Sequence, residues 1–182
     1  MNDLSIDIET LGTASNAAVL SIGAVFFDRA TGEIGKSFYT QIDLAWSLSS
    51  GAISADTLRW WMGQNADARR VFEPGGVDAP SACQQFVSFV QGGPAHVIPW
   101  GNGATFDVTI LETLLARYGF AAPWRFWNIR DMRTLMETAE LAGFSRDQIP
   151  FQGTAHNALD DAQHQARCIS AAWQQLQSAL GH

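Results

Sequence analysis

The chain has 182 residues, of which 47% are hydrophobic and 16% are charged, and its formal net charge is −7. This length and composition can bury one substantial core, so we expect a single domain over residues 1–182. The acidic balance excludes the broad basic surface with which proteins wrap duplex DNA, but it is compatible with a site whose positive charge comes from bound cations. We find no apolar run of membrane-spanning length, no signal peptide and no cysteine framework, and we expect no membrane association and a cytoplasmic location.

The first predicted strand, residues 4–10, alternates apolar and polar side chains. Its apolar residues would share one face, and Asp7 and Glu9 would share the other, with their Cα atoms about 6.5 Å apart. Two interpretations are open. The acids belong to a solvated strand face, or they form part of a site for a hard cation such as Mg²⁺, which prefers carboxylate oxygens. The second interpretation requires further acids from elsewhere in the chain.

Two more strands are predicted at residues 18–28 and 37–42. The short connections between these three strands indicate an antiparallel meander. Ser54 is a good N-cap for a helix that runs to about residue 64, and Pro80 opens a later helix from its first turn. The first half of the chain therefore predicts a meander followed by helices.

A fourth strand is predicted at residues 95–100, followed by a glycine-containing turn and a helix over about residues 106–118. Counting back by three and four from the apolar stripe of this helix leads to Asp107, which therefore heads the buried face. An acid at this position satisfies free amides of the first turn, or it faces across the strand ends toward Asp7 and Glu9.

The last third of the chain begins with a short fifth strand, predicted at residues 125–129, and a helix for which Asp131 is explained by capping alone. An irregular segment follows at residues 143–155, and such long segments in compact domains are often functional. In the final helix, the apolar stripe places Asp160 nearly opposite the core and Asp161 at its flank. Asp161 is therefore the better candidate for a site between helix and sheet.

His156 stands just before the final helix, so its ring can reach the same region from the preceding loop. A lone histidine there is either structural or functional. Together these residues resemble the DEDD, or DnaQ-like, superfamily of 3′-5′ exonucleases, in its histidine-containing DEDDh branch. The matching motifs are Asp-Ile-Glu-Thr at 7–10, Asn-Gly-Ala-Thr-Phe-Asp at 102–107 and His-Asn-Ala-Leu-Asp-Asp at 156–161. The last motif has the H-x-A-x-x-D spacing of the family, which also selects Asp161.

The resemblance implies an α/β, RNase H-like fold: a mixed five-stranded sheet, made of the three-stranded antiparallel meander plus two further strands, flanked by helices. Residues 56–61 and 127–134 look like the small bacterial and phage 3′-5′ exoribonucleases, a group to which DexA-like phage enzymes are similar. One departure is that Gly101, where many members have histidine, precedes Asn102. This departure concerns contacts with substrate and not the metal site.

The activity that the resemblance implies is metal-dependent 3′-5′ hydrolysis of single-stranded nucleic acid to nucleoside 5′-monophosphates, with RNA slightly favoured over DNA. His156 would be the general base. The expected ligands of two Mg²⁺ or Mn²⁺ ions are Asp7, Glu9, Asp107 and Asp161. The alternative is a catalytically weak nucleic-acid-binding or proofreading-associated module, against which the complete set of acids argues. A dinucleotide-binding oxidoreductase is excluded, because residues 101–103 lack the rest of a G-x-G-x-x-G fingerprint.

Residues after the first motif and within the second are candidates for contacting the 3′-terminal nucleotide. Trp60 and Trp61 are possible stacking residues, and Trp61 is our candidate. Adjacent helical residues point about 100° apart, so we expect only one to reach substrate; the alternative is that both belong to the core. The other expected substrate contacts are Leu11, Gly12, Asn102 and Phe106. Related exonucleases are often dimers, and the tryptophans around residues 60 and 124–127 are compatible with a homodimer interface.

Overall fold

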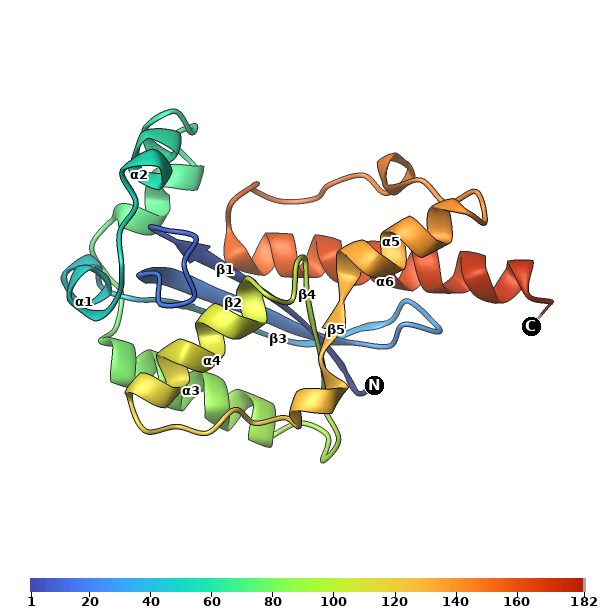
Figure 1. Ribbon diagram of the computed structural model, residues 1–182, viewed down its shortest axis with the longest axis horizontal. Coiled ribbons are helices and arrows are strands. Elements are labelled where there is room, and N and C mark those ends of the chain that lie inside the picture. The colour runs from blue at the N-terminus through green and yellow to red at the C-terminus, as the bar shows by residue number, and fades with distance from the viewer. Residues whose placement is uncertain (182) are drawn as a thin grey trace.

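A mixed five-stranded sheet forms the centre of the computed structural model, which describes residues 1–181 (Figure 1). The strand order is β3-β2-β1-β4-β5; β1, β2 and β3 pair antiparallel, and β4 and β5 add parallel strands beside β1. The strands are β1 Asp3–Thr10, β2 Val19–Phe27, β3 Ile34–Gln41, β4 Ile98–Gly101 and β5 Arg130–Asp131. The predicted RNase H-like arrangement of a meander plus two further strands is confirmed.

Helices cover both faces of the sheet. In Figure 1, α3 and α4 lie on one face and α5 and α6 on the other, while α1, α2 and η1 gather at one end. The α-helices are α1 Leu44–Ser50, α2 Ala55–Met62, α3 Ala79–Gln91, α4 Asp107–Arg117, α5 Met132–Glu140 and α6 Ala158–Ala179. The short 3-10 helices are η1 Ala68–Phe72, η2 Phe126–Asn128 and η3 Arg146–Gln148. Within residues 1–181, no helix is both long and apolar enough to cross a membrane.

The alternation of β1 divides its side chains between two layers. Leu4, Ile6 and Ile8 are at most 3% exposed and pack with α3 and α4 in the largest core cluster. The opposite face is turned toward α6, where Gln165 donates a hydrogen bond to Asp7. The period of two in the sequence therefore places the acids of β1 between the sheet and the last helix.

Close packing of α6 on the sheet depends on a glycine in β2. A Cβ atom at Gly23 would lie 2.1 Å from the carbonyl carbon of Ala158, the first residue of α6. Only glycine leaves room for the two backbones at this distance. This contact fixes the start of α6, and with it the third motif, directly over the strands that carry the first.

Two elements differ from the sequence expectations. Residues 126–128 form η2, and the fifth strand is only Arg130–Asp131, so the strand predicted at 125–129 is wrong. Helix α1 was not predicted because it lacks a buried apolar stripe. Its buried residues are Ser47 and Ser50, and the hydroxyl of Ser47 donates to the carbonyl of Val19 at 2.6 Å. A serine face gives no hydrophobic periodicity.

Candidate active site

Four carboxylates from three elements meet in one pocket of about 620 Å³. Asp7 and Glu9 come from β1, Asp107 is the first residue of α4, and Asp161 lies in the first turn of α6. The predicted residues are thus brought together although they are up to 154 positions apart in the sequence, the difference between 161 and 7. His156 lines the same pocket.

Asp7 lies at the centre of the acidic cluster. Its Oδ1 accepts a hydrogen bond of 2.6 Å from Nε2 of Gln165. Burial raises the pKa of Asp7 well above 3.8, and the charges of Asp107, Glu9 and Asp161 raise it further, while the Gln165 contact opposes the shift. The pKa of Glu9 is also raised well above its ordinary value, by burial and then by the charges of Asp161 and Asp107. The cluster therefore resists carrying its full negative charge.

Asp107 both satisfies amides at the start of α4 and faces the acids of β1, the two roles that the sequence left open. Burial raises its pKa to about 7, although hydrogen bonds from the backbone amides of Ile8, Asp107 itself and Asn102 act to lower it. The carboxylate thus satisfies amides at the start of α4, and its charge also acts on Asp7. At 3% exposure it has little access to solvent that could screen its charge.

The donor set suits a divalent cation. Glu9, His156 and Asp161 each offer one ligand atom, and these three atoms lie within 4.8 Å of one another. Burial also raises the pKa of Asp161, although the hydrogen bond from the His156 amide and the charge of His156 act to lower it. Carboxylate oxygens with an imidazole fit Mg²⁺, Mn²⁺ or Zn²⁺, and a bound cation would stabilise the ionised carboxylates, which burial and then mutual repulsion disfavour.

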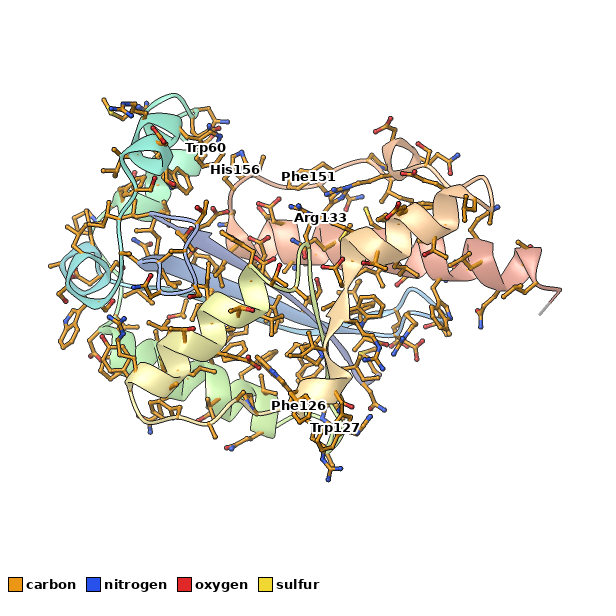
Figure 2. All side chains as sticks on the ribbon, in the orientation of Figure 1. Trp60, Phe126, Trp127, Arg133, Phe151 and His156 are labelled. Carbon is orange, nitrogen blue, oxygen red and sulfur yellow. The ribbon has the colours of Figure 1, made fainter. Side chains whose placement is uncertain are left out.

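His156 is held in an uncommon backbone conformation. Its φ is 65°, the only positive φ of a non-glycine residue among residues 1–181. Its amide donates to Oδ2 of Asp161 at 2.7 Å, and its ring packs edge-on against Trp60, with centroids 4.8 Å apart (Figure 2). Such a conformation costs about 1–2 kcal/mol and persists where the surroundings impose it, commonly at functional sites.

The structure separates the expected substrate contacts into two groups. Gly12, Asn102 and Phe106 line the pocket. Trp61 and Leu11 do not, because their side chains are 2% and 1% exposed and pack in a core cluster with η1.

The choice of Trp61 as the stacking residue is therefore wrong, and for Leu11 no side-chain contact with substrate is available. Trp61 uses its Nε1 to donate to the buried carbonyl of Thr10 at 2.8 Å. Trp60, 45% exposed, lines the pocket instead. One tryptophan faces the site and the other the core, as the helical geometry predicted, but the assignment between them is reversed.

Several pocket residues were missed by sequence reasoning. Gln165 had a signal, because it follows Asp161 by one helical turn on the same flank of α6. Arg133 from α5 and Arg146 from η3 had none, since each lies in a segment with no catalytic motif. The remaining residues of the pocket that were not anticipated are Ile8, Thr10, Thr13, Asp56 and Thr57.

The sheet, the order of the motifs and the converging acids agree with the predicted resemblance to 3′-5′ exonucleases of the DEDD type. Comparison with known families agrees. Residues 2–173 match the model of the Rv2179c-like 3′-5′ exoribonuclease domain, and the chain belongs to this family. It is a phosphodiester hydrolase.

One relative and three solved structures extend the comparison. The chain is 28% identical over 166 residues to an exodeoxyribonuclease of Enterobacteria phage T4, covering 75% of this chain and 71% of the phage protein. It shares its fold with S. pombe Pop2p in an Mg²⁺- and Mn²⁺-bound form, at a TM-score of 0.65 and 13% identity over 93% of this chain and 82% of that one.

The nuclease domain of 3′hExo bound to rAMP gives a TM-score of 0.54 at 15% identity, over 97% of this chain and 92% of that one. The zinc-bound complex of E. coli ExoI with single-stranded DNA gives 0.64 at 14% identity, over 97% of this chain but 40% of that one. At identities of 13–15%, these three structures show that the fold is shared and nothing more about this chain.

Proposed function

We propose that this pocket removes nucleoside 5′-monophosphates one at a time from the 3′ end of single-stranded nucleic acid, with RNA slightly preferred over DNA. The observation that carries the proposal is the meeting of four carboxylates in one pocket, Glu9 and Asp107 buried and Asp7 and Asp161 half-buried, with His156 beside two of them. The matched family is described as exoribonuclease, whereas the phage relative is named an exodeoxyribonuclease. The family match covers more of the chain and supports the preference for RNA.

Asp7, Glu9, Asp107 and Asp161 are proposed to be the residues that would hold two Mg²⁺ or Mn²⁺ ions. Support comes from the raised pKa values of the cluster and from the metals in the Pop2p and ExoI structures. When bound, such ions stabilise negative charge on the phosphoryl oxygens and lower the pKa of a water molecule. Gln165 fixes the orientation of the Asp7 carboxylate from α6.

His156 is proposed to accept the proton of the attacking water. Its position between Asp161 and Trp60 fixes the ring at the edge of the acids, and an imidazole has a pKa suited to proton transfer near neutral pH. Water attacks phosphorus, the bond from phosphorus to the 3′ oxygen of the preceding nucleotide breaks, and that oxygen takes up a proton. Trp60 stacks on the terminal base, and the backbone at Gly12 lies beside it.

The test uses 5′-labelled single-stranded RNA and DNA of one sequence. With Mg²⁺ or Mn²⁺ we expect both strands to shorten stepwise from the 3′ end, and RNA to shorten faster than DNA. A chelator or the substitution Asp7→Asn should abolish this shortening. Asp147→Asn, an exposed acid of η3 outside the pocket, is the matched control and should retain full activity. Full activity in chelator contradicts the metal-dependent mechanism. Tight binding of both strands without products would favour the alternative, a binding module.

The role of His156 has its own test. His156→Ala should lower kcat by about 10²- to 10⁴-fold, the usual contribution of general base catalysis, while affinity for Mn²⁺ measured by calorimetry stays within a few-fold. Loss of Mn²⁺ binding in a folded His156→Ala variant would show that this residue is a metal ligand and not the base.

Residues 1–182 are further proposed to act as one exonuclease domain that pairs as a homodimer. Phe126 and Trp127 are 76% and 58% exposed, and they contact each other at a ring distance of 4.8 Å (Figure 2). Light scattering on the purified chain should give twice its mass of 19.8 kDa. A mass of 19.8 kDa at all concentrations tested would contradict pairing.

A further inference from the structure

Two arginines line the otherwise acidic pocket, Arg133 from α5 and Arg146 from η3. Five carboxylates line it as well, the four of the cluster and Asp56. Both arginines are exposed, and among residues 1–181 no salt bridge involves either of them. An arginine without a carboxylate partner at the mouth of a pocket is available to bind an anion.

The two arginines belong to different walls of the pocket. Arg133 lies against the turn of the second motif: its Nε donates to Oδ1 of Asn102 at 3.4 Å, and a Cβ at Gly103 would lie 3.5 Å from its Cζ. Arg146 lies beside α6, where its charge acts on Asp161 and on Cys168. Guanidinium groups from two walls can contact one anion from both sides.

The place of Arg133 along the pocket indicates which anion the two arginines bind. Figure 2 shows Trp60 and His156 together at one end and Arg133 apart from them, near the end of β4. Under the proposed function, the terminal nucleoside occupies the Trp60 end and the scissile phosphate lies at the acids. The strand then continues past Asn102 and Arg133 toward its 5′ side.

We propose that Arg133 and Arg146 form a binding site for the phosphate one nucleotide to the 5′ side of the scissile phosphate. This inference rests on the proposed function and extends it. Metal ions held by the carboxylates would neutralise the scissile phosphate. The next phosphate would instead meet a pocket wall with a net negative charge, unless positively charged side chains of the protein contact it. Arg133 and Arg146 supply them, with planar donors that match phosphate oxygens.

The test compares two dinucleotides that differ by one phosphate group. NpN contains only the scissile phosphodiester, and pNpN adds a 5′-phosphate at the position assigned to the arginines. For the wild-type chain we expect kcat/KM to be about 10-fold or more higher on pNpN, the usual size of a charge-assisted hydrogen bond to an anion. The ratio of the two values should fall in Arg133→Gln and in Arg146→Gln, and it should approach one in the double variant.

Controls separate this role from a structural one. Arg125→Gln changes an exposed arginine that lies over the Trp127 ring, outside the pocket, and should keep the wild-type ratio. On a longer single strand, the slope of log KM against log salt should decrease by about 0.7 for each phosphate contact removed, an effect that a merely structural residue would not produce. Arg133→Lys should restore part of the preference, because it returns the charge without the planar donors.

Two outcomes overturn the inference while leaving the proposed function standing: a double variant that keeps the preference for pNpN, and variants that lose NpN and pNpN equally. A wild-type chain that cleaves neither dinucleotide nor any longer strand with Mn²⁺ present overturns the proposed function itself, and the inference with it. Circular dichroism of each variant verifies that the chain is folded.

Discussion

The acidic cluster predicts an unusual dependence of stability on pH for the metal-free chain. Burial raises the pKa of Asp107 from 3.8 to about 7 in the folded state. Because the folded-state pKa lies above the unfolded one, the stability that Asp107 contributes is fully present below about pH 3.8 and is lost as pH rises through about 7. Metal-free protein should therefore be less stable at about pH 8 than at about pH 5.5.

The magnitude follows from the pKa of this one group. Between about pH 5.5 and about pH 8, ionisation of Asp107 lowers the free energy of unfolding by about 2 kcal/mol. For a chain of this length, that corresponds to a decrease of about 4–8 °C in Tm. Asp7 and Glu9, whose pKa values are also raised, act in the same direction. His164 acts in the opposite direction, because burial lowers its pKa.

Melting curves of wild type and Asp107→Asn, recorded in chelator at both pH values, isolate the contribution of Asp107. The asparagine does not ionise, so the variant should lose less stability with rising pH and should melt above wild type at about pH 8. Adding Mg²⁺ or Mn²⁺ at that pH should raise the Tm of wild type more than that of the variant, because binding to the folded state alone stabilises it. If the difference in Tm between the two proteins is the same at both pH values, burial does not raise the pKa of Asp107 as inferred.

Three further pairs of substitutions test other parts of the structure. Gly23→Ala should destabilise the chain by about 3 kcal/mol or more in denaturant titration, because its Cβ would meet the backbone of Ala158. The control Gly63→Ala, whose Cβ would lie 3.4 Å from its nearest neighbour, should be tolerated. Equal stabilities of the two variants would contradict the close approach of α6 and β2. Trp61→Phe should lower the free energy of unfolding by about 2 kcal/mol, because it leaves the buried Thr10 carbonyl without its hydrogen-bond donor. Trp60→Phe should alter KM and leave Tm unchanged. The reverse result would restore Trp61 as the stacking residue. Gln165→Leu should lower activity or Mn²⁺ affinity by about 10-fold, because Asp7 loses the hydrogen bond that orders its carboxylate. Gln163→Leu, on the same helix, should change neither. Identical kinetics of the two variants would mean that Asp7 needs no support from α6.

Periodicity in the sequence was sufficient to place the acids. A period of two put Asp7 and Glu9 on one face of β1, and a period of 3.6 put Asp107 and Asp161 on faces turned toward the sheet. Burial enforces both periods: the opposite face of β1 carries the apolar core, whereas in α4 and α6 the acids stand at the head or at the flank of the apolar stripe itself. The caps at Ser54 and Asp131 were also readable, since each side chain satisfies free amides locally, but capping alone does not explain Asp131, whose Oδ2 also accepts from the amide of Ala104 at 2.7 Å.

Features that depend on distant partners could not be read from the sequence. Which of Trp60 and Trp61 is buried depends on what packs against α2, namely Leu11 and Val71 from other parts of the chain. The two-residue strand β5 is too short to show a pattern, and Arg146 reaches the pocket from an irregular segment. In each case the determining contact is tertiary and leaves no periodic trace.

The position of β1 inside the sheet has a consequence for hydrogen exchange. β1 is paired with β2 along its length and with β4 at its start, so we expect the amides that are bonded in these pairs to exchange only when the domain unfolds. Residues 151–153, which lead to His156, are exposed, and they exchange through local opening. Asp7 and Glu9 therefore lie on a strand that we expect to be protected, and His156 follows a segment that we expect to open locally, so this segment can open and close between turnovers while the two acids of β1 stay in place.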